Sequence, residues 1–216
     1  MKCVVTAGPT YEPLDEVRCL TNFSTGRLGS DLANYLAEQG HEVTLLVGSH
    51  AIYRGNPQAG RVDTFTTTTD LRFRLKAFAG QNIGAVFHAA AVCDFAFGGV
   101  WERTATGELI PCPAPKISTR KGELLAELKP TPKIISELRD WYSGARLVGW
   151  KYELEGDRAR VISLAEAQMS KNRTDACVVN GAAYGEGFGL VATGGKCEHF
   201  ADASALYRAL AKFIGS

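Results

Sequence analysis

The hydrophobic positions along the chain switch repeatedly between two spacings. Short aliphatic and β-branched runs, such as Lys2–Thr6 and Gly84–Ala91, are typical of buried strands. From Leu28 to Gln39 the apolar residues instead recur at helical spacing, and Gly40 follows where such a helix would end. Because the two spacings alternate over most of the chain, the pattern predicts a β/α series.

The same pattern predicts the remaining elements. Further strands are expected at Val43–Val47, Arg61–Thr66, 146–150 and 175–179, with a hairpin at Phe188–Phe200. Further helices are expected at Asp70–Ala79 (with Asp70 as the N-cap), 131–142, 157–171 and Ala203–Phe213. Strands that alternate with helices of about 10–15 residues form parallel sheets covered on both faces. We therefore expect an α/β fold, a Rossmann-like three-layer domain with a mostly parallel central sheet.

The segment from about Ala96 to Lys121 does not fit this series. It contains Gly98–Gly99 and three prolines between residues 111 and 115, and it shows no sustained hydrophobic period. Connections longer than about 12–15 residues without regular structure are uncommon in compact domains and are often functional. The segment is therefore predicted to be a long, mobile, functional flap within a single domain that spans residues 1–216.

Composition and charge exclude several classes of protein. The 216 residues include 24 basic and 23 acidic side chains, which leaves a net charge of +1. Because there is no basic excess to follow a phosphate backbone, nucleic acid is not expected as a partner. No apolar stretch approaches the roughly 20 residues of a membrane helix, and the six cysteines form no Cys-x-x-Cys pair. These features favour a soluble cytoplasmic protein in a reducing compartment.

The expected fold first suggests an NAD(P)-dependent oxidoreductase, but the usual binding motifs are missing. No Gly-x-Gly-x-x-Gly follows the first strand. The second strand ends at Val47-Gly48-Ser49, without an acidic residue for a ribose hydroxyl. Thr193–Cys197 also lacks the spacing of a phosphate-binding Walker loop. The oxidoreductase remains an alternative that only the β/α pattern supports.

Two polar segments flank the loop after the first strand. Gly8–Thr10 follows that strand directly, and Asn22–Gly26 directly precedes the first helix. Backbone N–H groups near Ser24, Thr25 and Gly26, at a helix N-terminus, would form a favourable site for an anion. The alternative is that Ser24 or Thr25 only caps the helix.

Two charged positions complete the candidate site. Asp94 follows the strand at Gly84–Ala91, at the carboxyl edge where parallel sheets bind their ligands. Its carboxylate could accept hydrogen bonds from an amino group of a base or sugar, or it could only cap a turn. Lys116 lies in the expected flap, near Arg120 and Lys121, where clustered charges most often form a solvated surface.

Several short motifs occur in order over most of the chain. They are Val5–Thr10, Glu12–Asp15, Thr21–Gly26, Ala89–Phe95, Lys116–Ser118 and Lys171–Asn172. Together they resemble phosphopantothenate–cysteine ligase, the second enzyme of coenzyme A synthesis. The resemblance implies that the carboxylate of 4′-phosphopantothenate attacks the α-phosphate of CTP or ATP, which gives an acyl-nucleotide and pyrophosphate. The amine of cysteine would then displace the nucleotide to form an amide.

The resemblance also assigns roles to individual residues. Asn22 corresponds to the residue that holds the acyl-nucleotide, and Lys116 to the flap lysine that closes over the reacting phosphate, so both are candidate catalytic residues. The candidate nucleotide-binding residues are Gly8, Pro9, Thr10, Ser24, Thr25, Gly26, Ala89, Ala90, Asp94, Thr131, Pro132, Lys133, Ile134, Trp150 and Lys171. An aromatic residue that ends a strand, as Trp150 does, is more often part of the core. Mg²⁺ is the implied cofactor, and its ligands are not assigned.

Two departures from the family affect the expected nucleotide. Ser118 and Thr119 follow Lys116 where many bacterial relatives have lysines, although stand-alone bacterial forms share this feature. Ala167 replaces a family lysine, which weakens the phosphate contacts and keeps a non-catalytic nucleotide-binding module as a second alternative. CTP is the favoured nucleotide. The family implies a homodimer, and a chain that begins at the ligase's first strand resembles the stand-alone form.

Overall fold

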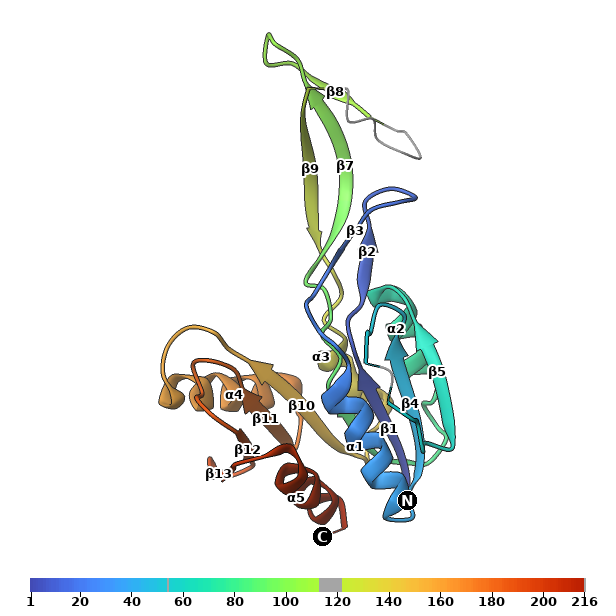
Figure 1. Ribbon diagram of the computed structural model, residues 1–216, viewed down its shortest axis with the longest axis vertical. Coiled ribbons are helices and arrows are strands. Elements are labelled where there is room, and N and C mark those ends of the chain that lie inside the picture. Colours follow the sequence, from blue (N-terminus) through green and yellow to red (C-terminus); the bar gives the residue numbers. More distant parts are fainter. Residues whose placement is uncertain (54, 113–121, 216) are drawn as a thin grey trace.

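A computed structural model describes residues 1–53, 55–112 and 122–215 of the chain. Its centre is an eight-stranded sheet with the strand order β13-β12-β11-β10-β6-β1-β4-β5 (Figure 1). The parallel strands are β1 (Lys2–Ala7), β4 (Glu42–Gly48), β5 (Arg61–Phe65), β6 (Ile83–His88), β10 (Arg146–Tyr152) and β11 (Ala176–Asn180). The antiparallel edge consists of β12 (Phe188–Ala192) and β13 (Cys197–Phe200), which form the expected hairpin.

Helices cover both faces of this sheet. On one face lie α1 (Arg27–Glu38) and α5 (Ala203–Gly215), and on the other lie α2 (Thr68–Ala77) and α3 (Ile134–Trp141). The last helix, α4 (Arg158–Asn172), packs on β10 and β11. The predicted three-layer α/β fold is therefore confirmed. None of the helices in the described part of the chain is long and apolar enough to cross a bilayer.

The central strand β1 shows why the sequence pattern predicts this arrangement. Val5 faces α1 and packs in the same cluster as Leu32, whereas Val4 faces the other layer and packs with Leu138. All four side chains are buried. A strand buried on both faces reads as a continuous apolar run, as this one does.

The segment expected to be an irregular flap contains regular structure, so that part of the prediction was wrong. β7 (Phe95–Arg103) pairs with β8 (Leu109–Pro111) and with β9 (Glu123–Pro130) in a three-stranded antiparallel sheet. Figure 1 shows this sheet projecting from the body as an arm. The β7–β9 register shifts between Phe97 and Val100, so the apolar residues do not alternate steadily and the strand is hidden in the sequence. Its mobility stays a prediction.

The start of α2 also differs from the prediction. The N-cap is Thr67, whose side chain accepts a hydrogen bond from the Asp70 N–H at 3.2 Å. The Asp70 carboxylate reaches back instead and accepts from the Thr66 N–H at 2.9 Å. This reciprocal arrangement resembles a capping box, in which the acidic residue stands inside the first turn and the cap precedes it.

A short hairpin that the sequence did not predict rises above the carboxyl edge of β1. It consists of β2 (Tyr11–Pro13) and β3 (Cys19–Thr21), and β2 also contacts β7 at the base of the arm. The Thr21 hydroxyl donates to the Thr10 carbonyl at 2.8 Å. The hairpin therefore returns the chain to the first loop before α1 begins.

Candidate functional site

The loops after β1 and β6 extend the parallel pairing beyond the ends of the two strands. β6 ends at His88, earlier than expected, and the chain then runs beside Gly8–Thr10. The Ala91 N–H donates to the Gly8 carbonyl at 3.0 Å, and the Thr10 N–H donates to the Ala91 carbonyl at 3.1 Å. Pro9 and Ala91 are paired in a parallel bridge. The structure thus joins two of the predicted nucleotide-binding segments at the carboxyl edge of the sheet.

Two buried threonine hydroxyls hold the second of these loops in place. Thr6 Oγ1 accepts a hydrogen bond from the Ala90 N–H at 3.0 Å, and Thr10 Oγ1 accepts one from the Cys93 N–H at 2.8 Å. Both threonines are fully buried. Because these hydroxyls satisfy backbone donors that have left the sheet ladder, residues 89–93 can follow an irregular path at the edge.

Asn22 bridges the first-helix segment to this edge. Its Nδ2 donates to the Ala91 carbonyl at 3.1 Å, the same oxygen that accepts from the Thr10 N–H. The residue is exposed, so a ligand can reach its side chain. The predicted catalytic residue therefore lies directly over the two joined loops.

The segment before α1 packs closely on the first loop. Gly26, the N-cap of α1, has φ = 80°, and a Cβ on this residue would lie 3.3 Å from Gly8 Cα. Gly26 has no side chain to cap the helix, and Thr25 Oγ1 accepts from the Arg27 N–H at 3.2 Å. The N-terminus of α1 has no side-chain hydrogen bond from its N-cap residue, and a helix start of this kind suits an anion. Ser24 lies in the same turn.

Asp94 contacts a third segment of the chain, the one that leads into α3. The Thr131 N–H donates to the Asp94 carbonyl at 3.0 Å, and the Lys133 ammonium lies 3.2 Å from the Asp94 carboxylate. Pro132 stands between these two residues, and Ile134 begins α3. Both charged side chains of the pair are about two-thirds exposed, at 67% and 69%, so a ligand can compete for either of them.

The remaining predicted residues differ in their placement. Trp150 stands one residue beyond the Gly149–His88 pair in β10, and its side chain packs on the core that faces α1 and α5. Its indole N–H is buried without a hydrogen-bond partner in the described part of the chain. Trp150 is therefore a core residue at the carboxyl edge, where it could also contact a ligand.

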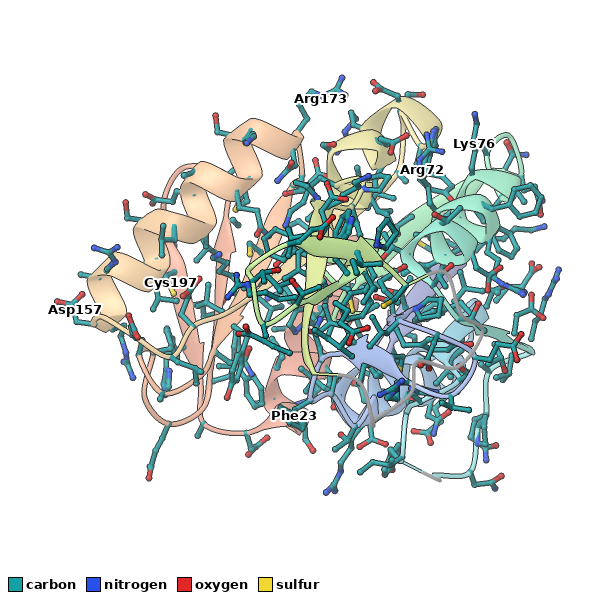
Figure 2. All side chains as sticks on the ribbon, turned by 90° about the horizontal axis from the view of Figure 1, so that it is seen from above. Phe23, Arg72, Lys76, Asp157, Arg173 and Cys197 are labelled. Carbon is teal, nitrogen blue, oxygen red and sulfur yellow. The ribbon has the colours of Figure 1, made fainter. Side chains whose placement is uncertain are left out.

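Within this chain, Lys171 lies apart from the predicted site residues at the carboxyl edge of the sheet. It occupies the last turn of α4, and Arg173 just beyond it pairs with Asp140 near the end of α3 opposite to Lys133. In Figure 2, Arg173 and Phe23, the residue after Asn22, lie on opposite sides of the molecule. Lys116 lies outside the described residues, so its role stays a prediction.

His88, which ends β6 beneath these loops, was not among the site residues predicted from the sequence. It is 6% exposed, and its Nδ1 lies 3.1 Å from Thr6 Oγ1. Burial, and to a smaller extent the Lys133 cation, lowers the pKa of His88 to about 4, so its imidazole is neutral at pH 7. The one available signal was a polar residue at the end of an otherwise apolar strand.

Metal binding by the protein alone finds no support among the described residues. Within residues 1–53, 55–112 and 122–215, no cluster of three or more His, Cys, Asp or Glu side chains could hold an ion. Asp94 offers a single carboxylate, and it pairs with Lys133. Mg²⁺ usually binds through substrate phosphates and one or two carboxylates, so this donor set fits an ion that a triphosphate carries better than a protein cage.

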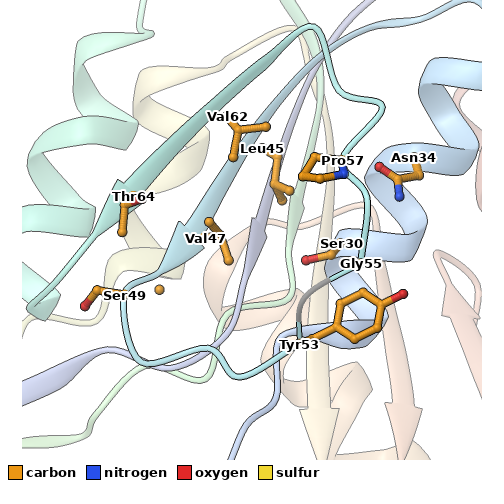
Figure 3. Close-up of a pocket in the computed structure, with 11 residues that line it drawn as sticks. Ser30, Asn34, Leu45, Val47, Ser49, Tyr53, Gly55, Pro57, Val62 and Thr64 are labelled. Carbon is orange, nitrogen blue, oxygen red and sulfur yellow. The ribbon is translucent and has the colours of Figure 1, made fainter.

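A separate pocket of about 160 Å³ opens between α1 and the strands β4 and β5 (Figure 3). Ser30 and Asn34 of α1, Val47 of β4, Thr64 of β5 and Tyr53 contribute to its walls. Of the predicted site residues that the structure describes, none lines it. The candidate site is thus an open edge of the sheet, distinct from this pocket.

Comparison with known sequences identifies the family. The family described as the DNA/pantothenate metabolism flavoprotein C-terminal domain matches residues 1–196. This chain belongs to that family. The match includes every predicted site residue, from Gly8 to Lys171.

Curated relatives are longer than this chain. It is 29% identical over 180 residues to the coenzyme A biosynthesis bifunctional protein CoaBC of Thermococcus kodakarensis. The matched region covers 83% of this chain and 41% of the relative. It is 30% identical over 187 residues to a cysteine/cysteine sulfinic acid decarboxylase of an unknown prokaryotic organism, with 86% and 47% coverage. The chain therefore spans less than half the length of these relatives.

Solved structures agree on the fold. A DNA/pantothenate metabolism flavoprotein from Streptococcus pneumoniae superposes with a TM-score of 0.85 at 24% identity, covering 100% of this chain and 98% of that one. The C-terminal domain of a CoaBC protein superposes with a TM-score of 0.74 at 22% identity, covering 99% of this chain and 93% of that one. A Cab2 variant in complex with phosphopantothenate-cysteine superposes with a TM-score of 0.72 at 18% identity, covering 99% of this chain and 87% of that one.

Proposed function

We propose that this protein is a ligase of coenzyme A biosynthesis that joins 4′-phosphopantothenate to cysteine. The observation that carries the proposal is the meeting of three separate chain segments at one edge of the sheet. Asn22 and Thr10 both donate to the Ala91 carbonyl, and Asp94 binds the segment that contains Lys133. Family membership and the CoaBC relatives support the same conclusion.

The proposed chemistry requires positioning more than acid–base catalysis. The carboxylate of 4′-phosphopantothenate is already a nucleophile, and its attack on the α-phosphorus of the nucleotide expels pyrophosphate. The cysteine amine then attacks the acyl carbon, and the nucleoside monophosphate leaves with the bonding electron pair. Holding two anions in this geometry is the main task of the protein, and it can lower the barrier by several kcal/mol.

Each predicted segment then has a defined task. The N–H groups at the start of α1 would hold phosphate oxygens beside the Gly8–Thr10 loop, and Asn22 would hold the acyl-nucleotide. Asp94 would accept from the nucleotide, with Lys133 and the start of α3 facing the triphosphate. Lys116 would close over the reacting phosphate, and Trp150 would complete the nucleotide contacts. The role of Lys171, which lies apart from these residues in the last turn of α4, stays a prediction.

CTP is proposed as the nucleotide, with ATP as the alternative, and Mg²⁺ as the ion that accompanies the triphosphate. Mg²⁺ would neutralise phosphate charge when bound. The six cysteines form no disulfide with one another in the part of the chain that the structure describes, which supports a cytoplasmic location.

The direct test mixes the protein with 4′-phosphopantothenate, cysteine, Mg²⁺ and either CTP or ATP. We expect pyrophosphate release that depends on phosphopantothenate, and an amide product that also requires cysteine. Pyrophosphate release without phosphopantothenate, or no release with either nucleotide, would contradict the proposal. Tight CTP binding without turnover would instead favour a non-catalytic nucleotide-binding module.

A homodimer is also proposed, with the arm as its contact surface. Phe95, Leu109, Ile110 and Leu128 are exposed on β7, β8 and β9, and no helix formed by the described residues lies beside this sheet in Figure 1. A small sheet with exposed apolar residues is stabilised when a second copy covers it.

Sedimentation equilibrium should give a molecular mass of twice the 23.3 kDa chain mass, and Leu128→Lys should lower the measured mass towards that of one chain. A monomeric wild-type protein at micromolar concentration would contradict this.

A further inference from the structure

His88, Thr6 and the Ala90 backbone form a connected hydrogen-bond chain beneath the candidate site. The Ala90 N–H donates to Thr6 Oγ1 at 3.0 Å, and Thr6 Oγ1 lies 3.1 Å from His88 Nδ1. Thr6 is fully buried and His88 is 6% exposed. These contacts determine which nitrogen of the imidazole carries the proton, because buried donors must find acceptors.

The Thr6 hydroxyl has a single proton to donate. If His88 Nδ1 carried a proton and donated to Thr6, the buried hydroxyl would have no acceptor among its partners in the described residues. If Nδ1 is the acceptor, the Thr6 hydroxyl donates to it, and the Ala90 N–H, the Thr6 hydroxyl and His88 Nδ1 are all satisfied. The second arrangement leaves the proton of the neutral imidazole on Nε2.

The free N–H of His88 lies beneath the start of α3. Thr6 and His88 are paired in the β1–β6 register, on the face of the sheet that α3 covers with Ile134 and Ile135. Lys133, the N-cap of α3, is close enough for its charge to act on the imidazole. In the part of the chain that the structure describes, His88 Nε2 has no hydrogen-bond partner. His88 Nε2 therefore keeps some contact with solvent, although the residue is only 6% exposed, and it does so on the face of the sheet where α3 begins with Lys133 as its N-cap.

We propose that His88 Nε2–H donates a hydrogen bond to an anionic oxygen of a substrate, a phosphate or carboxylate oxygen, held at the start of α3. The inference rests on the proposed function, and it adds His88 to the residues that contact substrate. The imidazole acts as a neutral donor, because burial and Lys133 disfavour its charged form. Thr6 is a positioning residue that fixes the tautomer through its hydroxyl.

The tautomer can be read in the free protein by ¹⁵N NMR of its four histidines. His88, assigned by comparison with His88→Gln, is expected to show an unprotonated Nδ1 and a protonated Nε2. Thr6→Val should remove this preference while leaving His199, which contacts Tyr184 at 3.1 Å, unchanged. A protonated Nδ1 in the wild-type protein would overturn the inference.

Ligand contact is tested in the same spectra by adding Mg²⁺–CTP, Mg²⁺–ATP, inorganic pyrophosphate and 4′-phosphopantothenate separately. The His88 Nε2–H signal should shift with the ligand whose oxygen it binds, and His199 serves as the reference that should not shift. A shift with the nucleotides and pyrophosphate identifies a phosphate of the nucleotide, whereas a shift with 4′-phosphopantothenate alone identifies the acid. No shift with any of them would overturn the inference, whether or not the protein is a ligase.

Kinetics provide a third readout in the active protein. His88→Leu should raise the KM of the bound substrate about 10- to 100-fold, the usual effect of one hydrogen bond to a charged group. His88→Gln, which keeps an N–H donor, should recover most of that loss. Unchanged KM values in His88→Leu, in a wild-type background that makes product, would refute the role of His88 and leave the ligase intact.

Discussion

Asn22→Asp should slow turnover by about 100- to 1,000-fold, the usual cost of removing one hydrogen-bond donor from a site that stabilises developing charge. The substitution replaces the Nδ2 donor, now 3.1 Å from the Ala91 carbonyl, with an oxygen that repels it. It also adds a negative charge where two anionic substrates must meet. Turnover should fall by far more than the affinity for the nucleotide, measured by calorimetry, because the Thr10 N–H still joins the two loops through the Ala91 carbonyl.

Asn34→Asp is the matched control for this change. Asn34 also donates from Nδ2 to a backbone carbonyl, that of Asn56 at 3.0 Å, but it lies on α1 away from the carboxyl-edge loops. The same chemical change there should leave turnover within about twofold of wild type, in line with the small effects of most surface substitutions. Unchanged turnover in Asn22→Asp would remove Asn22 from the mechanism.

Gly48→Ala should damage the site without altering any residue that contacts substrate. A Cβ at Gly48 would lie 2.2 Å from the Pro9 carbonyl oxygen, and 3.1 Å from both Pro9 N and Pro9 C. The loop that contains Gly8 and Thr10 must therefore move. We expect a loss of about 1–3 kcal/mol in the free energy of unfolding, as for other overpacking substitutions. Turnover should fall at least about tenfold, because displaced phosphate contacts cost roughly 1.4 kcal/mol or more.

Thermal melting and kinetics together check this prediction, with Gly144→Ala as the control. A Cβ at Gly144 would meet no atom of the surrounding described residues within 4 Å, so this substitution should change neither property. For a protein of this size, 1 kcal/mol corresponds to a shift in Tm of about 2–4 °C. A Gly48→Ala protein with wild-type Tm and turnover would show that the first loop does not need its present position.

The central sheet was predictable because hydrophobic residues recur at regular spacing in its strands and in the helices that cover it. Val4 and Val5 point to opposite layers, and both are apolar, so β1 could be recognised from sequence alone. The arm could not be recognised in this way. Its strands bury little in one chain, and the register shift at Gly98–Gly99 interrupts the alternation that identifies a strand.

The site was predictable in part, for a topological reason. Parallel strands β1 and β6 end at the same edge, so the loops that contain Thr10 and Asp94 had to be neighbours. The ion pair between Asp94 and Lys133 was not predictable, because it depends on how the arm returns the chain to α3. Thr6 and His88 were missed because a threonine inside a strand reads as an ordinary β-branched residue, and its hydrogen bond links residues 82 positions apart.

The most direct test of the proposed ligase follows an oxygen atom. If the carboxylate of 4′-phosphopantothenate, labelled with ¹⁸O, attacks the α-phosphorus, one labelled oxygen must leave with the nucleoside monophosphate when cysteine displaces it. Mass spectrometry should therefore find one ¹⁸O in CMP (or AMP) and the other in the amide product. Label in pyrophosphate or inorganic phosphate, or an unlabelled monophosphate alongside the amide, would contradict the acyl-nucleotide mechanism.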